Sequence, residues 1–266
     1  MKRVALILAG GAGTRLRPLS SDENPKQFLR IFDGQSLLQK TAARVRDFDT
    51  IYISTNDAYA GKCREHVPDA IVLTEPERRN NAPAIALSCF EIESREGDCV
   101  IAVLPSDHFI RDEVEFRRVL DRACAFAETN DYLVTIAIAP TEPHTGYGYL
   151  KLNGDMVERF VEKPDRAKAE EFLRAGNYAW NAGMFIWRAS VYRGALEPAA
   201  PEIPRGTRAN YSTMPESSID YALMEKAPRV AAIRGDFGWS DVGSFEALRA
   251  VGIDVDALLS KVEDRL

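Results

Sequence analysis

Short, continuously apolar segments alternate with helix-like patterns through the first half of this chain. The apolar segments lie at residues 4–9, 51–54, 71–73, 100–104 and 132–139, and apolar residues recur at helical spacing between them at 37–45, 84–92 and 116–126. Strands that are apolar along their whole length are buried on both faces. The alternation therefore predicts an α/β protein with a mostly parallel sheet covered by helices on each side. Ligands of such sheets bind beyond the carboxyl ends of the strands.

The second half of the chain has a different pattern. We expect strands over 147–152 and 157–162 around the turn Asn153-Gly154, a strand over 184–187, and helices over 166–174, 217–226 and 244–250. The proline-rich segment 198–215 is predicted to be a mobile surface loop. Residues 1–250 are interpreted as one domain, followed by a short C-terminal helix in 251–266 and no separate second domain.

The C-terminal helix carries apolar residues at helical spacing. We expect it to dock on the core or on another subunit, which leaves a homodimer open. These residues are Val255, Leu258, Leu259, Val262 and Leu266.

Composition excludes several classes of protein. A net charge of −6 argues against general nucleic-acid binding. No apolar run reaches the ~20 residues that a membrane span needs, and the short first strand ends in glycines rather than in a signal-peptide pattern, so we expect a cytoplasmic protein. Cysteines at 63, 89, 99 and 124 form no Cys-x-x-Cys pair and are predicted to be buried and reduced. The three histidines are far apart in sequence, which argues against a histidine metal site.

A glycine-rich turn follows the first apolar segment directly. It reads Gly10-Gly11-Ala12-Gly13, and Arg15 and Lys26 come shortly after it. Glycines let the backbone approach a ligand closely, exposed N–H groups suit phosphate, and the two cations add positive charge. The turn is neither a dinucleotide fingerprint, since Leu16 stands at the third glycine position, nor a kinase-like P-loop. It predicts a loop that grips a triphosphate at the same sheet edge as residues 105–108.

Separated motifs, in order along residues 3–250, resemble the sugar-nucleotide pyrophosphorylase family. They lie at residues 8–18, 25–28, 75–86, 104–108, 145–149, 160–164, 181–185, 218–226 and 237–244. Pro-Lys-Gln-Phe at 25–28, Arg-Asn-Asn-Ala-Pro-Ala at 79–84 and Gly-Trp-Ser-Asp-Val-Gly-Ser at 238–244 are similar to the guanylyl branch of that family.

The resemblance implies a fold and a reaction. The fold is a GT-A-like nucleotidyltransferase fold, a three-layer nucleotide-binding sandwich with a mixed, mainly parallel sheet. The reaction transfers GMP from GTP to mannose 1-phosphate, giving GDP-mannose and pyrophosphate. The alternatives are another sugar 1-phosphate nucleotidyltransferase, with a different base or manno-configured sugar, and a catalytically idle nucleotide-sugar sensor. Many relatives continue into a β-helical or isomerase domain, and isomerase activity is expected to be absent here.

Departures from the family pattern leave every charged catalytic group in place but keep base and sugar preference open. The departing residues are Ala12, Arg17, Asn81, Ala182 and Phe245.

The resemblance also implies roles for individual residues. Arg15, Lys26 and Asp107 would be catalytic. The nucleotide would be bound by Ala9, Gly10, Gly11, Gly13, Thr14, Arg15, Lys26, Glu75, Arg79, Asn80 and Asp107. The sugar phosphate would be bound by Gly146, Glu162, Lys163, Asn181 and Gly183. Asp107 and Asp241 would hold Mg²⁺, although a cap of the helix near Ser244 is a rival interpretation of Asp241.

Overall fold

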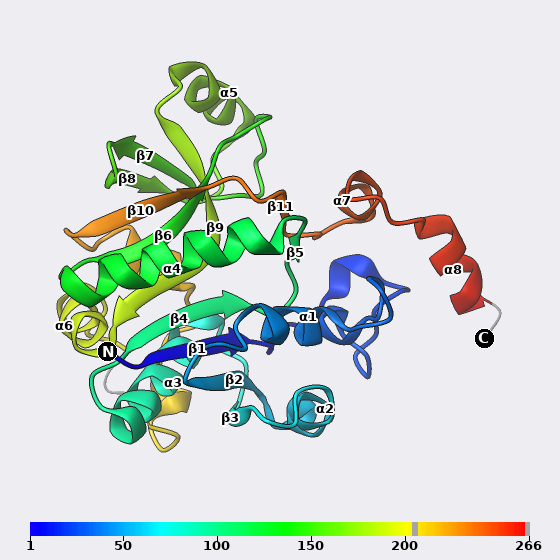
Figure 1. The fold of residues 1–266 in the computed structure, drawn as a ribbon, viewed down its shortest axis with the longest axis horizontal. Helices are drawn as coiled ribbons and strands as arrows, with labels where there is room; N and C mark the ends of the chain where they lie inside the picture. Colours follow the sequence, from blue (N-terminus) through cyan, green and yellow to red (C-terminus); the bar gives the residue numbers. More distant parts are fainter. Residues whose placement is uncertain (204–206, 264–266) are drawn as a thin grey trace.

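A mixed sheet forms the centre of the molecule (Figure 1). The computed structural model describes residues 1–203 and 207–263. Within them, the strands of the main sheet follow the order β3-β2-β1-β4-β9-β6-β10-β8-β7. These strands are β1 (Arg3–Leu8), β2 (Thr50–Asn56), β3 (Ile71–Glu75), β4 (Val100–Pro105), β6 (Leu133–Ile138), β7 (Tyr149–Asn153), β8 (Met156–Val161), β9 (Tyr178–Arg188) and β10 (Val230–Gly235).

Strand directions confirm the predicted mixed sheet, but antiparallel pairings are as common in it as parallel ones. β1 to β4 pair in parallel, as do β6 and β10. β9 lies antiparallel between β4 and β6, and β8 lies antiparallel to β10 and β7. β5 (Phe109–Ile110) and β11 (Trp239–Ser240) form a separate short ribbon.

Helices cover both faces of the sheet. The apolar cluster on one face combines the sheet with α1 (Leu37–Arg44), α2 (Ala60–His66) and α4 (Glu113–Thr129), and the cluster on the other face includes α3 (Asn81–Glu96) and α6 (Ala189–Ala199). Alternate residues of β1 belong to the two clusters. Val4 and Leu6 pack on one face of the sheet and Ala5 and Ile7 on the other, and all four are fully buried. The predicted burial of the strands on both faces is therefore confirmed.

The remaining helices lie at the ends of the sheet. α5 (Arg166–Ala175) packs through Phe172 on Tyr149 and Tyr178. α7 (Phe245–Ala250) and α8 (Val255–Glu263) extend from the body towards the C-terminus (Figure 1). Val255 docks on the core as expected, in a cluster with Leu16 and Leu37, whereas Leu266 lies outside the described residues.

Two predictions in the second half are wrong in part. Within residues 217–226 the main helical element is a π-helical turn, η5 (Asp220–Met224), and the N–H of Ile219 before it donates to the side chain of Asn81 in α3. Within 198–215, Tyr211 and Met214 are fully buried, so a surface loop does not describe them; residues 204–206 lie outside the described residues. No helix in the described part of the chain is long and apolar enough to cross a membrane.

Candidate active site

A cavity of about 670 Å³ opens at the carboxyl ends of β1, β3 and β4. Its volume suits a bound small molecule. Segments far apart in the sequence line it, and they carry most of the predicted site residues. The lining includes Gly10, Gly11, Arg15, Glu75, Asn80, Asp107, Gly146, Glu162, Lys163, Asn181, Gly183 and Asp241.

The glycine-rich turn is held in place by the side chain of Gln27. Its side-chain amide donates to the carbonyls of Ala9 and Gly11, at 2.8 and 3.0 Å. These hydrogen bonds from Gln27 engage carbonyl oxygens that would otherwise repel a phosphate. Gly13 adopts a left-handed conformation with φ of 62°, and a Cβ there would lie 2.6 Å from Cβ of Lys26. Only glycine lets the loop fold onto Lys26 in this way.

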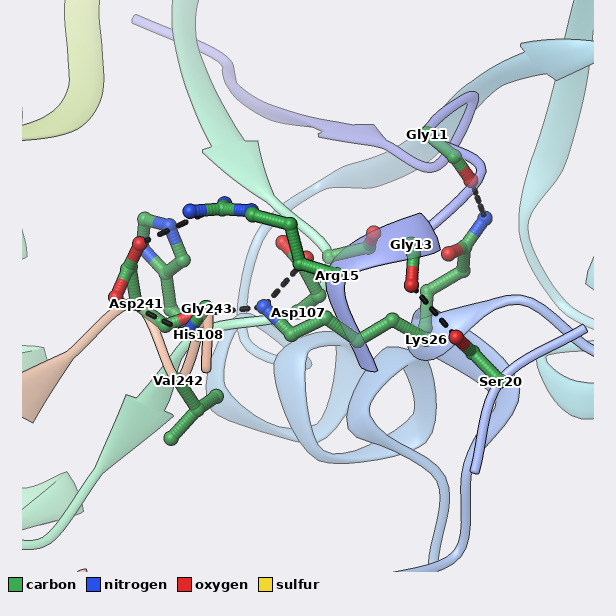
Figure 2. Close-up of polar contacts among 12 residues, drawn as sticks. Gly11, Gly13, Arg15, Ser20, Lys26, Asp107, His108, Asp241, Val242 and Gly243 are labelled. Carbon is green, nitrogen blue, oxygen red and sulfur yellow. Dashed lines mark hydrogen bonds and ion pairs between the residues drawn. The ribbon is translucent and has the colours of Figure 1, made fainter. Parts of the chain in front are cut away.

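Lys26 is the centre of the polar network in Figure 2. Its side chain is buried, and its ammonium group lies 2.7 Å from Oδ2 of Asp107 and donates to the backbone carbonyl of Asp241 at 2.5 Å. Burial opposes ionisation of Asp107, but the charge and hydrogen bond of Lys26, together with His108 and Arg15, outweigh it, so the pKa of the carboxyl is held below its usual range. A lysine has three N–H donors, which leaves one for a substrate.

Asp241 is held from several sides. Its Oδ1 accepts from the hydroxyl of Tyr147 at 3.0 Å and from the N–H of Gly243 at 3.1 Å, and its Oδ2 lies 3.9 Å from Nη2 of Arg15. The helix α7 is capped by Ser244, whose hydroxyl accepts from the N–H of Ala247. The cap interpretation of Asp241 is therefore not supported, because Ser244 already fills that place.

The residues present fit a magnesium ion. Asp107 and Asp241 both line the cavity, and Lys26 contacts both residues. No group of three or more potential metal-ligating side chains occurs among the described residues. Mg²⁺ typically uses one or two carboxylates plus substrate phosphates, so the two aspartates in the lining of this cavity are compatible with such an ion.

The opposite wall of the cavity carries the predicted sugar-phosphate residues. The ammonium group of Lys163 lies 3.0 Å from Oε1 of Glu162, and Glu162 lies so close to Gly148 that a Cβ there would be 2.6 Å from Oε2. Lys163 has a φ of 44°, a strained conformation for a residue with a side chain. Such strain is concentrated at functional sites.

A bulge in β9 brings Asn181 and Gly183 to this wall. The pairing of β6 and β9 shifts between Thr135 and Ala137, and Gly183 within the bulge has a φ of 66°. Bulges redirect side chains next to active sites.

Five predicted site residues do not line the cavity. Ala9 is buried, Thr14 is exposed at the start of a 3-10 turn, Gly13 packs closely on Lys26, and Lys26 itself is buried. Arg79 was expected in the base pocket, but its guanidinium donates instead to the carbonyl of Met214 and to Glu77.

Four residues that were not predicted as site residues line the cavity or, in the case of Tyr211, contact its lining. Arg78 lines it where Arg79 was expected. Tyr211 donates to Oε2 of Glu75 at 2.5 Å from a segment predicted to be a surface loop. Burial lowers the pKa of His108 to about 4, and its Nδ1 accepts from the indole N–H of Trp239. Asp220 lines the sugar side. None of these four residues has a sequence signal that separates it from its neighbours.

The covered mixed sheet, with a cavity at the carboxyl ends of its strands, defines an α/β protein whose architecture fits a nucleotide-binding sandwich. Residues 4–256 match the family model described as nucleotidyl transferase, and the chain belongs to that family. This confirms the resemblance seen in the sequence motifs.

Several relatives point to the same family. The chain is 41% identical to the xanthan biosynthesis protein XanB of Xanthomonas campestris, over 91% of this chain and 58% of the relative. It is 36% identical to the mannose-1-phosphate guanylyltransferase RfbM of Salmonella typhimurium, over 93% of this chain and 58% of the relative. The chain thus spans less than two thirds of the length of these curated relatives. A solved structure from Thermus thermophilus, described as a mannose-1-phosphate geranyltransferase, matches with a TM-score of 0.88 and 34% identity over 96% of this chain and 80% of that one.

Proposed function

We propose that this protein transfers the GMP group of GTP to mannose 1-phosphate, releasing pyrophosphate and forming GDP-mannose, with residues 1–250 as the catalytic unit. The observation that carries the proposal is the contact of Lys26 with both Asp107 and Asp241 directly beneath the glycine-rich turn. Such a cluster has one cation and two carboxylates beside a phosphate loop, which suits phosphoryl chemistry.

The nucleophile is the phosphate of the sugar. Its second pKa is about 6, so it is largely a dianion at neutral pH and requires no general base. One of its oxygens attacks the α-phosphorus of GTP, the bond from that phosphorus to the bridging oxygen breaks, and pyrophosphate leaves. The protein has to align two anions and stabilise the charge that develops on the leaving group.

The residues divide this work. The glycine-rich turn cradles the triphosphate, Lys26 donates its remaining N–H to it, and Arg15 at the exposed rim adds positive charge. Lys163 binds the sugar phosphate and Glu162 accepts from sugar hydroxyls. Asp107 and Asp241 would hold Mg²⁺, which when bound would neutralise charge on the phosphate oxygens.

The base of the nucleotide is recognised by the part of the cavity lining around Glu75 and Asn80. Glu75 is buried and anchored by Tyr211, and its other oxygen faces Gly10. A carboxylate is an acceptor, and guanine offers N–H donors on its Watson–Crick edge. A polar pocket of this kind discriminates strongly, because a wrong base leaves a buried group unpaired.

Pyrophosphate release over a grid of nucleoside triphosphates and sugar 1-phosphates tests the proposal. We expect GTP with mannose 1-phosphate to give the highest kcat/KM. A clear preference for UTP or dTTP with glucose 1-phosphate would overturn the guanylyl assignment, and binding without turnover of any pair would favour the idle sensor.

A further inference from the structure

Asp220 is a half-buried acid in the lining of the cavity, and the proposed phosphate transfer gives it no role. It begins the π-helical turn η5 (Asp220–Met224) and lines the cavity on the side of Glu162 and Lys163. Single π-helical turns are rare and occur frequently at functional sites. Asp220 also lies within residues 218–226, a motif for which the sequence offered no role.

The position of Asp220 is fixed by an ordered chain of polar groups. The backbone N–H of Gly183, which can only donate, lies 3.2 Å from Oδ1 of Asn181, and the hydroxyl of the fully buried Thr135 donates to the same oxygen at 2.8 Å. These contacts set the orientation of the Asn181 amide. Its Nδ2 therefore faces Asp220 and donates to Oδ1 at 3.1 Å.

Asn181 and Asp220 each keep a hydrogen-bonding group that can contact a ligand. Asn181 has a second amide N–H and Asp220 a second carboxylate oxygen, and both residues line the cavity. Burial, followed by the negative charge of Glu162, raises the pKa of Asp220 to about 7, against the opposing charge of Lys163.

The charge of Asp220 selects the part of the ligand that it can serve. The carboxyl group of Asp220 is ionised in part at neutral pH, and in that form it repels a phosphate, so it does not suit the phosphate group beside Lys163. A neutral group that carries hydrogen-bond donors suits it instead. A hydroxyl both donates and accepts, and can therefore bond to the carboxylate of Asp220 and the amide of Asn181 together.

We propose that Asp220 binds one hydroxyl of the hexose ring, jointly with Asn181, and so determines which sugar 1-phosphate is accepted. The inference rests on the proposed function. A sugar that lacks this hydroxyl, or holds it in the other configuration, would leave buried polar groups unpaired, which is expensive.

The test combines a variant with deoxy substrates. Asp220→Asn keeps the shape of the side chain and an oxygen for the Asn181 bond, but removes the carboxylate. Mannose 1-phosphate and its 2-, 3-, 4- and 6-deoxy analogues are compared by kcat/KM in the wild-type and variant proteins. At one of these positions, deletion of the hydroxyl should lower kcat/KM about 100-fold or more in the wild-type protein. In the variant, the same deletion should lower kcat/KM less than about 10-fold.

Controls separate recognition from structure. Glu225→Gln removes a nearby exposed carboxylate that accepts from the N–H of Glu162 but does not line the cavity, so its deoxy profile should match that of the wild-type protein. If Asp220→Asn folds poorly, as judged by thermal melting, Asp220→Ser replaces it and should show the same loss of discrimination.

The outcomes distinguish the two proposals. Equal losses in the wild-type and variant proteins at every hydroxyl, with mannose 1-phosphate still turned over, would overturn the role of Asp220 alone. A wild-type protein that turns over and binds no sugar 1-phosphate would overturn the proposed function, and this inference with it.

Discussion

The ammonium group of Lys26 lies 2.7 Å from Oδ2 of Asp107, although the two residues come from different strand-end loops. The side chain of Lys26 is only 6% exposed, so the pair has little solvent screening. The same ammonium group binds the carbonyl of Asp241, which joins the glycine-rich turn to both proposed metal ligands. Removal of any member of this cluster should therefore affect the chemical step.

Metal dependence should reside in Asp107 and Asp241. We expect EDTA to abolish turnover and Mg²⁺ to restore it, and Asp107→Asn to lower kcat at least ~100-fold, because charge beside the transferred phosphoryl group is lost. Asp241→Asn should also lower kcat strongly. Ser244→Ala provides the contrast, since loss of the α7 cap should cost about 1 kcal/mol of stability and little kcat. The reverse pattern, with Asp241→Asn active but less stable, would restore the cap interpretation.

Lys163 should act on the sugar phosphate alone. Its side chain is exposed and contacts Glu162 on the wall away from Lys26. Lys163→Ala should raise KM for mannose 1-phosphate and leave kcat little changed, because the contact is made equally in ground and transition states. GTP binding, measured by calorimetry without the sugar, should stay near normal. Lys168→Ala, at an exposed lysine of α5, is the control. An unchanged KM in Lys163→Ala would rule out the assignment.

Gly13 should not tolerate a side chain. Gly13→Ala places a Cβ 2.6 Å from Lys26 in a left-handed backbone conformation, so we expect a loss of about 1–3 kcal/mol in the free energy of unfolding, together with weaker GTP binding. Gly61→Ala is the matched control, because Gly61 is helical and has open space around it. That change should be neutral or stabilising by about 0.5–1 kcal/mol. Equal melting temperatures for the two variants would contradict this account of the loop.

The fold was predictable where burial dictates the sequence. β1 and β4 are apolar throughout because helices cover both faces of the sheet, and both were expected within a residue or two. The antiparallel position of β9 between β4 and β6 could not be predicted from the local sequence pattern. Its polar Asn181 and its Gly183 serve the cavity rather than the core, so they interrupt the apolar run that reveals a buried strand.

The site was predictable where a motif carries it and not where distant packing does. The glycine-rich turn and Asp107 follow buried strands, so their place at the carboxyl edge could be inferred. Arg78 and Arg79 have the same chemistry, and Arg79 is held outside the cavity by Glu77 and by the carbonyl of Met214, which is 135 residues away. Tyr211 was likewise assigned to a surface loop, because its partner Glu75 is 136 residues distant.

The kcat of Lys26→Ala tests the central claim most directly. Single-turnover pyrophosphate release from GTP and saturating mannose 1-phosphate should fall about 10²–10³-fold, the scale of losing one preorganised electrostatic donor. GTP binding should weaken as well, and far-ultraviolet circular dichroism should verify that the variant is folded. Lys151→Ala, which breaks a surface pair with Glu158, should match the wild-type rate. A folded Lys26→Ala protein with a rate within about threefold of the wild-type rate, well below that scale, would contradict the account.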